Sequence, residues 1–259
     1  MTRGWVILGG GLLLAALVRP AFGAPAALTL GVVPQMSPWA LARRWTPLIK
    51  AWSARSGYRI VLRTAPTIAR FERRVARGTY DLVFLNPADY ERYRSRYRAF
   101  ARGRGFLQGI LVVRRYGPRD LRALAGRVIA FPARAALAAS VMPRHMLRRA
   151  GIAFTARYVG SHDAVYRGVA AGLFAAGGGI RRTFDLLAPR LRGKLRILWR
   201  GPKTLPHPFA ARRDLPVAEV GRLRAALLAL PASAPQLLKP LGFTGFRGAT
   251  DRDYRRFLK

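Results

Sequence analysis

The residue types that could do chemistry in this chain gather in segment 160–183. The segment opens with Ser161, His162 and Asp163, continues through an apolar helical stretch, and reaches the glycines Gly177–Gly179. A Ser-His-Asp turn caps helices and can also contact a ligand, but no separate nucleophile or base accompanies it here. The glycines suit a tight strand exit or a backbone that approaches a small anion. The pattern therefore indicates a binding protein, and we expect no catalytic residues.

Metal and cofactor chemistry lacks a matching pattern in this sequence. The chain has no cysteine, and neither His145 nor His207 has a second ligand type at metal-binding spacing. We therefore expect neither a metal nor a cofactor. The absence of cysteine also excludes disulfides and lipid attachment after a signal peptide.

The charge of the chain is strongly positive. There are 47 Lys+Arg residues, 42 of them arginine, against 11 Asp+Glu, which gives a formal net charge of +36. Such a field attracts anions and would also suit nucleic acid. The arginines are spread along the whole chain instead of forming one basic stripe, which is typical of solvated helix faces. Nucleic acid is therefore not expected as a partner, and a polyanion binder is the weaker alternative.

The N-terminus has the three parts of a secretory signal peptide. Arg3 is followed by the apolar run Trp5–Val18, and Ala21 and Gly23 are small residues suited to cleavage. An uncleaved anchor is the alternative, but the run is short of the roughly 20 residues that span a bilayer. We expect residues 1–23 to be removed and the mature protein to be periplasmic, without a lipid anchor.

The elements that must position these residues alternate between strands and helices. This order, with near-continuous apolar strands such as Tyr80–Leu85, predicts an α/β fold with mixed, mostly parallel sheets. Trp39, Trp45 and Trp52 are expected in the core. Ligands of such sheets bind beyond the carboxyl ends of strands, where helices begin. Elements that bear on the site are predicted as helices over Ala133–Ala150, His162–Ala171 and Thr183–Leu191 and a strand over Leu173–Ala176.

A set of short motifs, in order along nearly the whole mature chain, resembles a known family. The chain resembles the periplasmic phosphate/phosphite/phosphonate-binding proteins of ABC transporters. Each motif is weak by itself, but their order is fairly specific. The motifs are LGVVPQ at 30–35, WTPL at 45–48, GTYDL at 78–82, LNPADY at 85–90, VIAFP at 128–132, GSHDAVY at 160–166, 177–183 and LGFTGF at 241–246.

The resemblance implies a two-lobed type II periplasmic-binding-protein fold, the Venus flytrap. The chain would cross between lobes near Gly105–Arg114 and near Arg200–Pro206. Residues 24–108 and 204–259 would form the first lobe and residues 109–203 the second. The ligand would lie in the cleft between them.

The resemblance also implies a set of ligand-binding residues. In the family a turn rich in Ser and Thr after the Val128–Phe131 strand grips the oxyanion, but here those hydroxyls are missing. Backbone N–H groups and Arg134 would replace them. Acidic residues that would hold a ligand amine are also missing, because Arg181 and Arg182 stand in their place. The expected site is Gln35, Ser37, Asn86, Tyr90, Ala133, Arg134, Ala135, Ala136, Ser161, His162, Gly178 and Gly179.

The implied function is capture of phosphate, phosphite or a simple phosphonate for uptake. The partners would be the small oxyanion and an ABC permease in the inner membrane, with the protein acting as a monomer. A periplasmic sensor that partners a membrane histidine kinase is the alternative with the same ligand.

Overall fold

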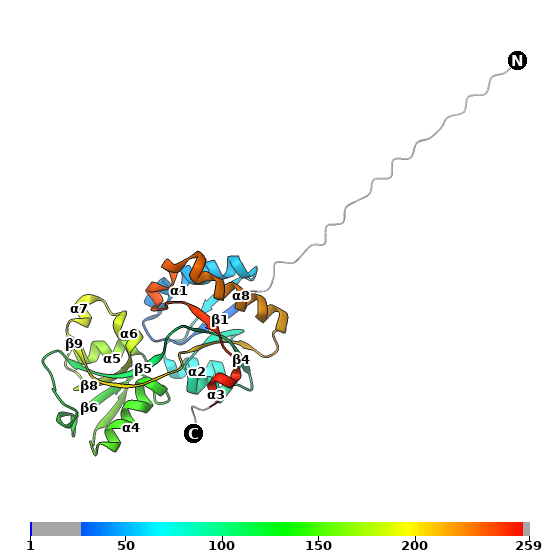
Figure 1. Cartoon of the computed structure of the whole chain (residues 1–259). Coiled ribbons are helices and arrows are strands. Elements are labelled where there is room, and N and C mark those ends of the chain that lie inside the picture. The colour runs from blue at the N-terminus through cyan, green and yellow to red at the C-terminus, as the bar shows by residue number, and fades with distance from the viewer. Residues whose placement is uncertain (2–26, 256–259) are drawn as a thin grey trace.

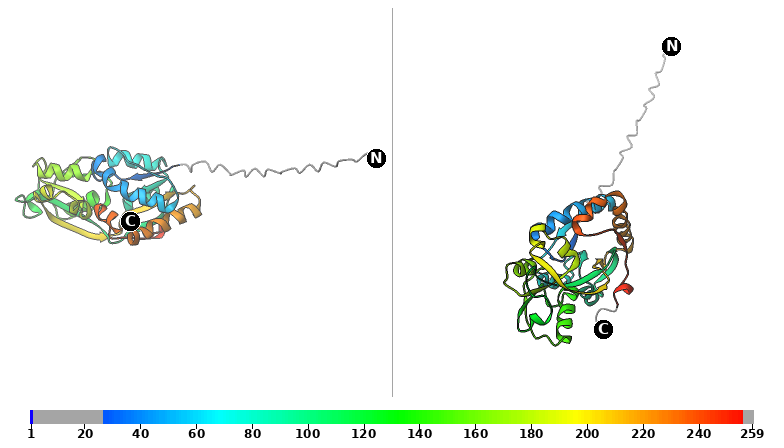
Figure 2. Two further views of the ribbon diagram at one scale, coloured as in Figure 1. Left: turned by 90° about the horizontal axis from the view of Figure 1, so that it is seen from above. Right: turned by 60° about the vertical axis from the view of Figure 1, so that its left-hand side comes forward.

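The computed structural model describes Met1 and residues 27–255, which form two α/β lobes (Figure 1). Seen from above, the second lobe, in green and yellow, lies beside the first, in blue and orange (Figure 2). Beyond Met1, the expected signal peptide at residues 1–23 lies outside the described residues. Within the described part of the chain, no helix has the length and apolar character to span a bilayer.

The first lobe contains a six-stranded sheet in the order β11-β4-β10-β3-β1-β2. Strands β1, β2 and β3 run parallel, whereas β10 pairs antiparallel with both β3 and β4, and β11 pairs antiparallel with β4. Because β3 is covered on both faces, all its residues are apolar and buried. These strands are Leu28–Val32 (β1), Ile60–Arg63 (β2), Leu82–Phe84 (β3), Tyr97–Gly103 (β4), Pro208–Arg212 (β10) and Phe246–Gly248 (β11).

The second lobe contains a five-stranded sheet in the order β7-β6-β8-β5-β9. Strand β6 is parallel to β7 and β8, whereas β5 is antiparallel to β8 and β9. The chain changes sheet between β4 and β5 and again between β9 and β10. The lobe boundaries expected from sequence, at 108/109 and 203/204, stay a prediction. These strands are Leu107–Arg114 (β5), Val128–Phe131 (β6), Thr155–Tyr158 (β7), Ala176–Ile180 (β8) and Leu195–Thr204 (β9).

Helices begin and end where the sequence supplies caps. The Ser37 hydroxyl accepts a hydrogen bond from the Ala40 N–H at the start of α1, and Gly57 ends α1 with a φ of 76°. The α-helices are Pro38–Ser56 (α1), Ile68–Ala76 (α2), Pro87–Tyr93 (α3), Met142–Arg149 (α4), His162–Ala170 (α5), Arg181–Asp185 (α6), Pro189–Arg192 (α7) and Val217–Ser233 (α8). Short turns are the π-helical Leu137–Val141 (η2) and the 3-10 turns Arg122–Leu124 (η1), Pro235–Leu237 (η3), Lys239–Leu241 (η4) and Asp251–Tyr254 (η5).

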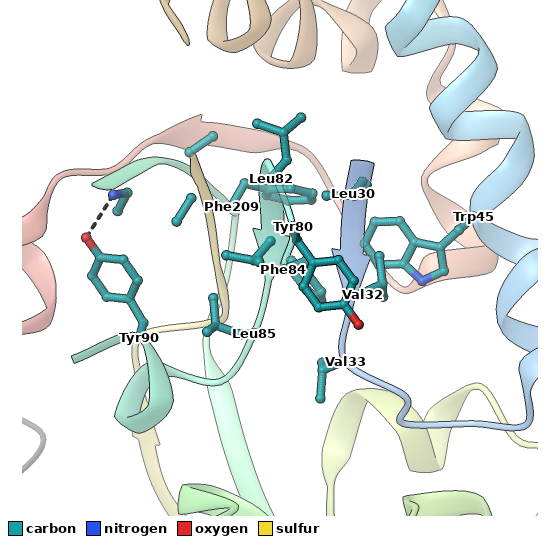
Figure 3. Packing of buried hydrophobic residues seen from close by; sticks show 14 of the residues in the cluster. Leu30, Val32, Val33, Trp45, Tyr80, Leu82, Phe84, Leu85, Tyr90 and Phe209 are labelled. Atoms are coloured by element: carbon teal, nitrogen blue, oxygen red, sulfur yellow. Dashed lines mark hydrogen bonds between the residues drawn. The ribbon is translucent and has the colours of Figure 1, made fainter. Parts of the chain in front are cut away.

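Aromatic rings fill the core of the first lobe (Figure 3). The ring centroids of Phe84 and Phe209 lie 4.8 Å apart, and Trp45 lies 5.0 Å from Phe84. Trp45 and Trp52 are buried as expected, but Trp39 is 69% exposed, so its placement in the core was wrong. Trp39 lies in the first turn of α1, before the face of that helix that packs on the sheet begins at Leu41.

Three elements of the second lobe differ from the sequence predictions. The helix expected from Ala133 begins only at η2, because Ala136 is extended with a ψ of 102°. The strand expected at Leu173–Ala176 is β8, so the glycines Gly177–Gly179 lie inside a strand and not after it. The helix expected over Thr183–Leu191 divides into α6 and α7, with Pro189 at the first position of α7, where proline is favoured.

The two lobes are closed on each other. Backbone hydrogen bonds join Ile68 N–H to the Gly160 carbonyl at 3.1 Å and Asp163 N–H to the Gln35 carbonyl at 3.3 Å. Arg44 of α1 also donates to the Leu186 carbonyl at 2.8 Å. These contacts join α1, the residues just before it and the start of α2 to the turn after β7, the start of α5 and the end of α6.

Candidate functional site

A small cavity lies between the lobes, with a volume of about 20 Å³. The first lobe contributes Gln35 after β1 and Asn86 at the start of α3, and the second lobe contributes segment 136–139 and His162. His207, in the connection between β9 and β10, also lines it. A buried water needs roughly 10–15 Å³ of accessible volume. The cavity therefore has room for about one water-sized molecule.

The structure brings together four of the residues predicted from sequence. Gln35, Asn86, Ala136 and His162 line one cavity although they come from distant parts of the chain. The other predicted residues do not line it. They are Ser37, Tyr90, Ala133, Arg134, Ala135, Ser161, Gly178 and Gly179.

His162 is a neutral, oriented imidazole at the start of α5. Its Nδ1 lies 3.0 Å from the Thr183 hydroxyl, which itself donates to the Ile180 carbonyl at 3.0 Å. The Tyr166 hydroxyl lies 2.9 Å from the same Thr183 oxygen. Burial first, and the charge of Arg182 second, lower the pKa of His162 to about 3. The imidazole is therefore uncharged at neutral pH and can contribute a hydrogen bond but no positive charge.

The positive charge next to the cavity comes from Arg182 of α6. One of its terminal nitrogens donates to the Gln35 amide oxygen at 2.7 Å, and the other donates to the Leu241 carbonyl at 3.1 Å. Its guanidinium carbon lies 5.4 Å from the ring centroid of Phe84 and 5.1 Å from that of Phe243. Burial lowers the pKa of Arg182 to about 10, so the group stays protonated at neutral pH.

Gln35 connects this arginine to a second neutral histidine. The Gln35 amide nitrogen lies 3.1 Å from His207 Nε2, and Gln35 is buried. Since an amide nitrogen only donates, His207 Nε2 accepts this bond and carries no proton. Burial, followed by the charges of Arg182 and His162, holds the pKa of His207 well below its usual range. Arg182, Gln35 and His207 thus form one hydrogen-bonded wall across the interface between the lobes.

Asn86 has a structural task in addition to lining the cavity. Its amide oxygen accepts the N–H groups of Ala88 at 3.0 Å and Asp89 at 3.1 Å, which caps α3. Its amide nitrogen donates to the Asp89 carboxyl. Burial first, and the neighbouring Glu72 carboxylate second, hold the pKa of Asp89 well above its usual range. Behind Asn86 thus lies a carboxyl pair, Asp89 and Glu72, whose pKa values are both raised, chiefly by burial.

The first turn of η2 forms another part of the cavity lining. Leu137, Ala138 and Ala139 line it at the first turn of η2, where N–H groups have no partner within the helix. Such N–H groups favour anions. The Ser140 hydroxyl is buried and has no partner among the described residues, but Ser140 does not line the cavity.

The glycines of β8 permit η2 and α5 to pack closely on the sheet. A Cβ atom on Gly178 would lie 2.0 Å from the Ala139 carbonyl oxygen, and one on Gly179 would lie 2.1 Å from the Tyr166 hydroxyl. Both glycines are buried in the central strand of the sheet, and neither reaches the cavity. Because these glycines have no side chains, η2 and Tyr166 can lie directly against the sheet.

The remaining predicted residues have other contacts in the closed structure. Ser37 and Ser161 cap α1 and α5, and the Tyr90 hydroxyl accepts the Ala99 N–H at 2.8 Å, away from the cavity (Figure 3). Arg134 is exposed, and its guanidinium lies 4.9 Å from the ring centroid of Tyr158.

Sequence reasoning did not select Arg182 and His207 for the site. In the sequence, Arg182 was noted only because it stands where the family has an acidic residue. Its hydrogen bond to Gln35 forms only when the two lobes are closed. His207 follows a strand of one lobe and precedes a strand of the other, and no local pattern marks such a position. No group of three or more His, Cys, Asp or Glu within the described residues could hold a metal ion.

The fold and the cavity define a two-lobed periplasmic binding protein. Residues 30–254 match the family described as ABC transporter, phosphonate, periplasmic substrate-binding protein. The chain belongs to this family of transporter components, and the family and fold expected from its motifs are confirmed. A search of curated protein sequences finds no significant match.

Solved structures with the same fold come from several bacteria. A binding protein component of an ABC phosphonate transporter from Pseudomonas aeruginosa is 15% identical, with a TM-score of 0.81 over 90% of this chain and 84% of that one. PhnD1 from Prochlorococcus marinus, in complex with methylphosphonate, is 19% identical, with a TM-score of 0.79 over 88% and 94%. The periplasmic VFT2 domain of BvgS from Bordetella pertussis is 20% identical, with a TM-score of 0.56 over 83% and 92%. At these identities the likeness is one of fold.

Proposed function

We propose that this protein captures a small phosphorus oxyanion, namely phosphate, phosphite or a simple phosphonate, in the cavity between its lobes and delivers it to an ABC permease. The observation that carries the proposal is the meeting of Gln35, Asn86 and His162 with the first turn of η2 around one cavity. The family of the chain supports the class of ligand. Residues 1–23 would direct the protein to the periplasm as a cleaved signal peptide, and the mature protein would act as a monomer without a lipid anchor.

The electrostatics of the cavity favour an anion without an amine. Arg182 keeps its proton beside Gln35, and no Asp or Glu among residues 27–255 lines the cavity. An ammonium group on the ligand would be repelled by Arg182 and would lose water without gaining a carboxylate partner. Because a volume of about 20 Å³ holds only a water-sized molecule, an oxyanion would enter when the lobes part and would hold them further apart than they are in this structure.

A thermal-shift screen at fixed ionic strength tests the ligand class. Phosphate, phosphite, methylphosphonate, aminoethylphosphonate, sulfate and arsenate are compared with the purified protein. A ligand at 100 times its Kd adds about 2.7 kcal/mol to the free energy of unfolding, which gives a clear shift. We expect a selective shift with one amine-free phosphorus oxyanion. Equal small shifts with all six anions would indicate charge screening and would contradict the proposal.

A pair of variants tests the location of the site. We expect His162→Ala to weaken binding of the selected oxyanion at least about tenfold, or about 1.4 kcal/mol, because the cavity loses its oriented imidazole. Arg134→Ala is the control, since Arg134 is exposed and lies outside the cavity lining. Isothermal titration of both variants measures the effect. Equal losses, or a loss only with Arg134→Ala, would place the ligand elsewhere.

Transport and sensing use the same binding step and differ in the membrane partner that receives the closed, ligand-bound protein. Deleting the gene and measuring uptake of the selected oxyanion separates them. Reduced uptake is expected for a transporter component, and unchanged uptake with altered gene expression would favour the sensor.

A further inference from the structure

A second, larger hollow lies between the lobes and is lined by residues of α1, α5, α6 and α7. Its volume is about 490 Å³, within the range of roughly 300–1,000 Å³ usual for small-molecule sites. Gln35 is the one residue that it shares with the lining of the oxyanion cavity. We call this hollow the α1 groove. Its lining includes Trp39, Arg43, Arg44, Asp163, Arg190 and Lys194.

The α1 groove carries a concentrated positive charge. Its lining includes four arginines and one lysine but a single acidic residue, Asp163, which pairs with Arg167 at 3.0 Å. Within residues 27–255, no carboxylate lies within ion-pair distance of Arg43, Arg44 or Arg190. Arg44 already donates to the Pro240 and Leu186 carbonyls. Arg43 and Arg190 are therefore the guanidinium groups whose charge a phosphate could neutralise through paired hydrogen bonds.

Trp39 adds a flat aromatic surface to this charged groove. Its side chain is 69% exposed, whereas Trp45 and Trp52 are buried. The guanidinium of Arg43 lies 4.6 Å from the centroid of the Trp39 ring, which shows that this ring already stacks with a planar cation. An exposed indole beside arginines suits a flat ring that carries negative charge.

The groove is shared between the lobes. Trp39 and Arg43 belong to α1 of the first lobe, whereas Arg190 and Lys194 belong to the second. A ligand that contacts both sets would be held best when the lobes are closed. We propose that the α1 groove is a second ligand site, which takes an aromatic phosphate, with its ring on Trp39 and its phosphate among the arginines of both lobes.

Fluorescence titration of the full chain with phenyl phosphate, at fixed ionic strength, tests this proposal. Cyclohexyl phosphate serves as the matched ligand, since it has the same charge but no flat ring. We expect saturable quenching by phenyl phosphate that is lost in Trp39→Phe, and binding by the cyclohexyl ester weaker by about fivefold or more.

Charge variants then locate the site. The exposed pair Arg190→Ser/Lys194→Ser should weaken binding of phenyl phosphate at least about tenfold, as expected for the loss of charge-assisted contacts. Arg119→Ser/Arg122→Ser removes the same charge from exposed positions that do not line the groove. Equal effects of the two double variants, or equal affinity for the two esters, would overturn the proposal. So would loss of binding in His162→Ala with no effect of Arg190→Ser/Lys194→Ser, because the ligand would then lie in the oxyanion cavity.

Discussion

At the scale of residues, one buried guanidinium sets the charge of the candidate oxyanion site. Arg182 stays protonated, whereas His162 and His207 stay neutral, and burial is the main cause of the lowered pKa in all three. The histidines can therefore select for hydrogen-bonding geometry while Arg182 selects for negative charge. Loss of the Arg182 charge and loss of the His162 imidazole should therefore change ligand preference in different ways.

The buried histidines make stability depend on pH. An unfolded histidine takes up a proton below about pH 6.5, but His162 in the folded protein does so only near pH 3. Its stabilising contribution is therefore present above pH 6.5 and is lost as the pH falls toward 3, with a slope of up to about 1.4 kcal/mol per pH unit. Urea denaturation of the wild type and of His162→Asn, at pH 7.5 and 5.0, measures this; the stability gap between them should shrink at pH 5.0.

The other groups near the cavity set the background for that experiment. Asp89 and Glu72 have raised pKa values, so their contribution has the opposite sign and rises as the pH falls. Both proteins retain this pair, and it cancels in the comparison. A constant gap for His162→Asn would show that His162 does not titrate as its burial implies.

At the scale of elements, the position of η2 depends on the absence of side chains in β8. The run Gly177–Gly179 lacks side chains where η2 and α5 come closest to the sheet. Since β8 lies between β6 and β5, it cannot move aside to admit even a methyl group. The position of the η2 backbone, and with it the wall of the cavity, therefore depends on these glycines although they do not touch the cavity.

Gly178→Ala tests this dependence. The new Cβ would lie 2.0 Å from the Ala139 carbonyl oxygen, so we expect a loss of about 1–3 kcal/mol in the free energy of unfolding, together with weaker ligand binding. Gly221→Ala in α8 is the control, because no atom lies within 4 Å of its added Cβ and alanine favours helices by about 1 kcal/mol. Thermal unfolding should move in opposite directions for the two variants. A Gly178→Ala protein as stable as the wild type would contradict this account of the packing.

At the scale of the whole molecule, Arg182 fastens the second lobe to the first. Its guanidinium reaches Gln35 and the Leu241 carbonyl and lies against Phe84 and Phe243, all in the first lobe. Hydrogen bonds to charged groups contribute about 1.5–3 kcal/mol each. These contacts require no ligand, so they favour the closed arrangement in the free protein.

Arg182→Gln should shift the ligand-free protein toward an open arrangement. Small-angle X-ray scattering would then show a larger radius of gyration than that of the wild type. Arg181→Gln is the control, since Arg181 is exposed and pairs with Asp185 of the same lobe at 2.8 Å. If Arg182→Gln scatters like the wild type, other contacts, such as that of Arg44 with Leu186, keep the lobes closed.

Much of the architecture could be predicted from sequence because it depends on local signals. Buried strands such as β3 are continuous apolar runs, and Ser37 and Asn86 mark helix starts through their own side chains. The order of motifs along the chain then identified the family and the two-lobed fold. The prediction was wrong where packing overrides local preference, as at Ala133–Ala136 and within Gly177–Gly179, because close approach of η2 to the sheet is a property of both segments together.

The sequence by itself determined the class of this protein, since the composition, the apolar N-terminal run and the order of motifs are properties of the chain read from end to end. It also named Gln35, Asn86 and His162, because each lies in a motif that resembles the family and matches a position where the family contacts its ligand. Only the tertiary structure decided that Arg182 and His207 join them and that Arg134 and Tyr90 do not line the cavity. The physical reason is that closure brings together side chains from two sheets, and a contact across that interface leaves no periodic or local trace in the sequence.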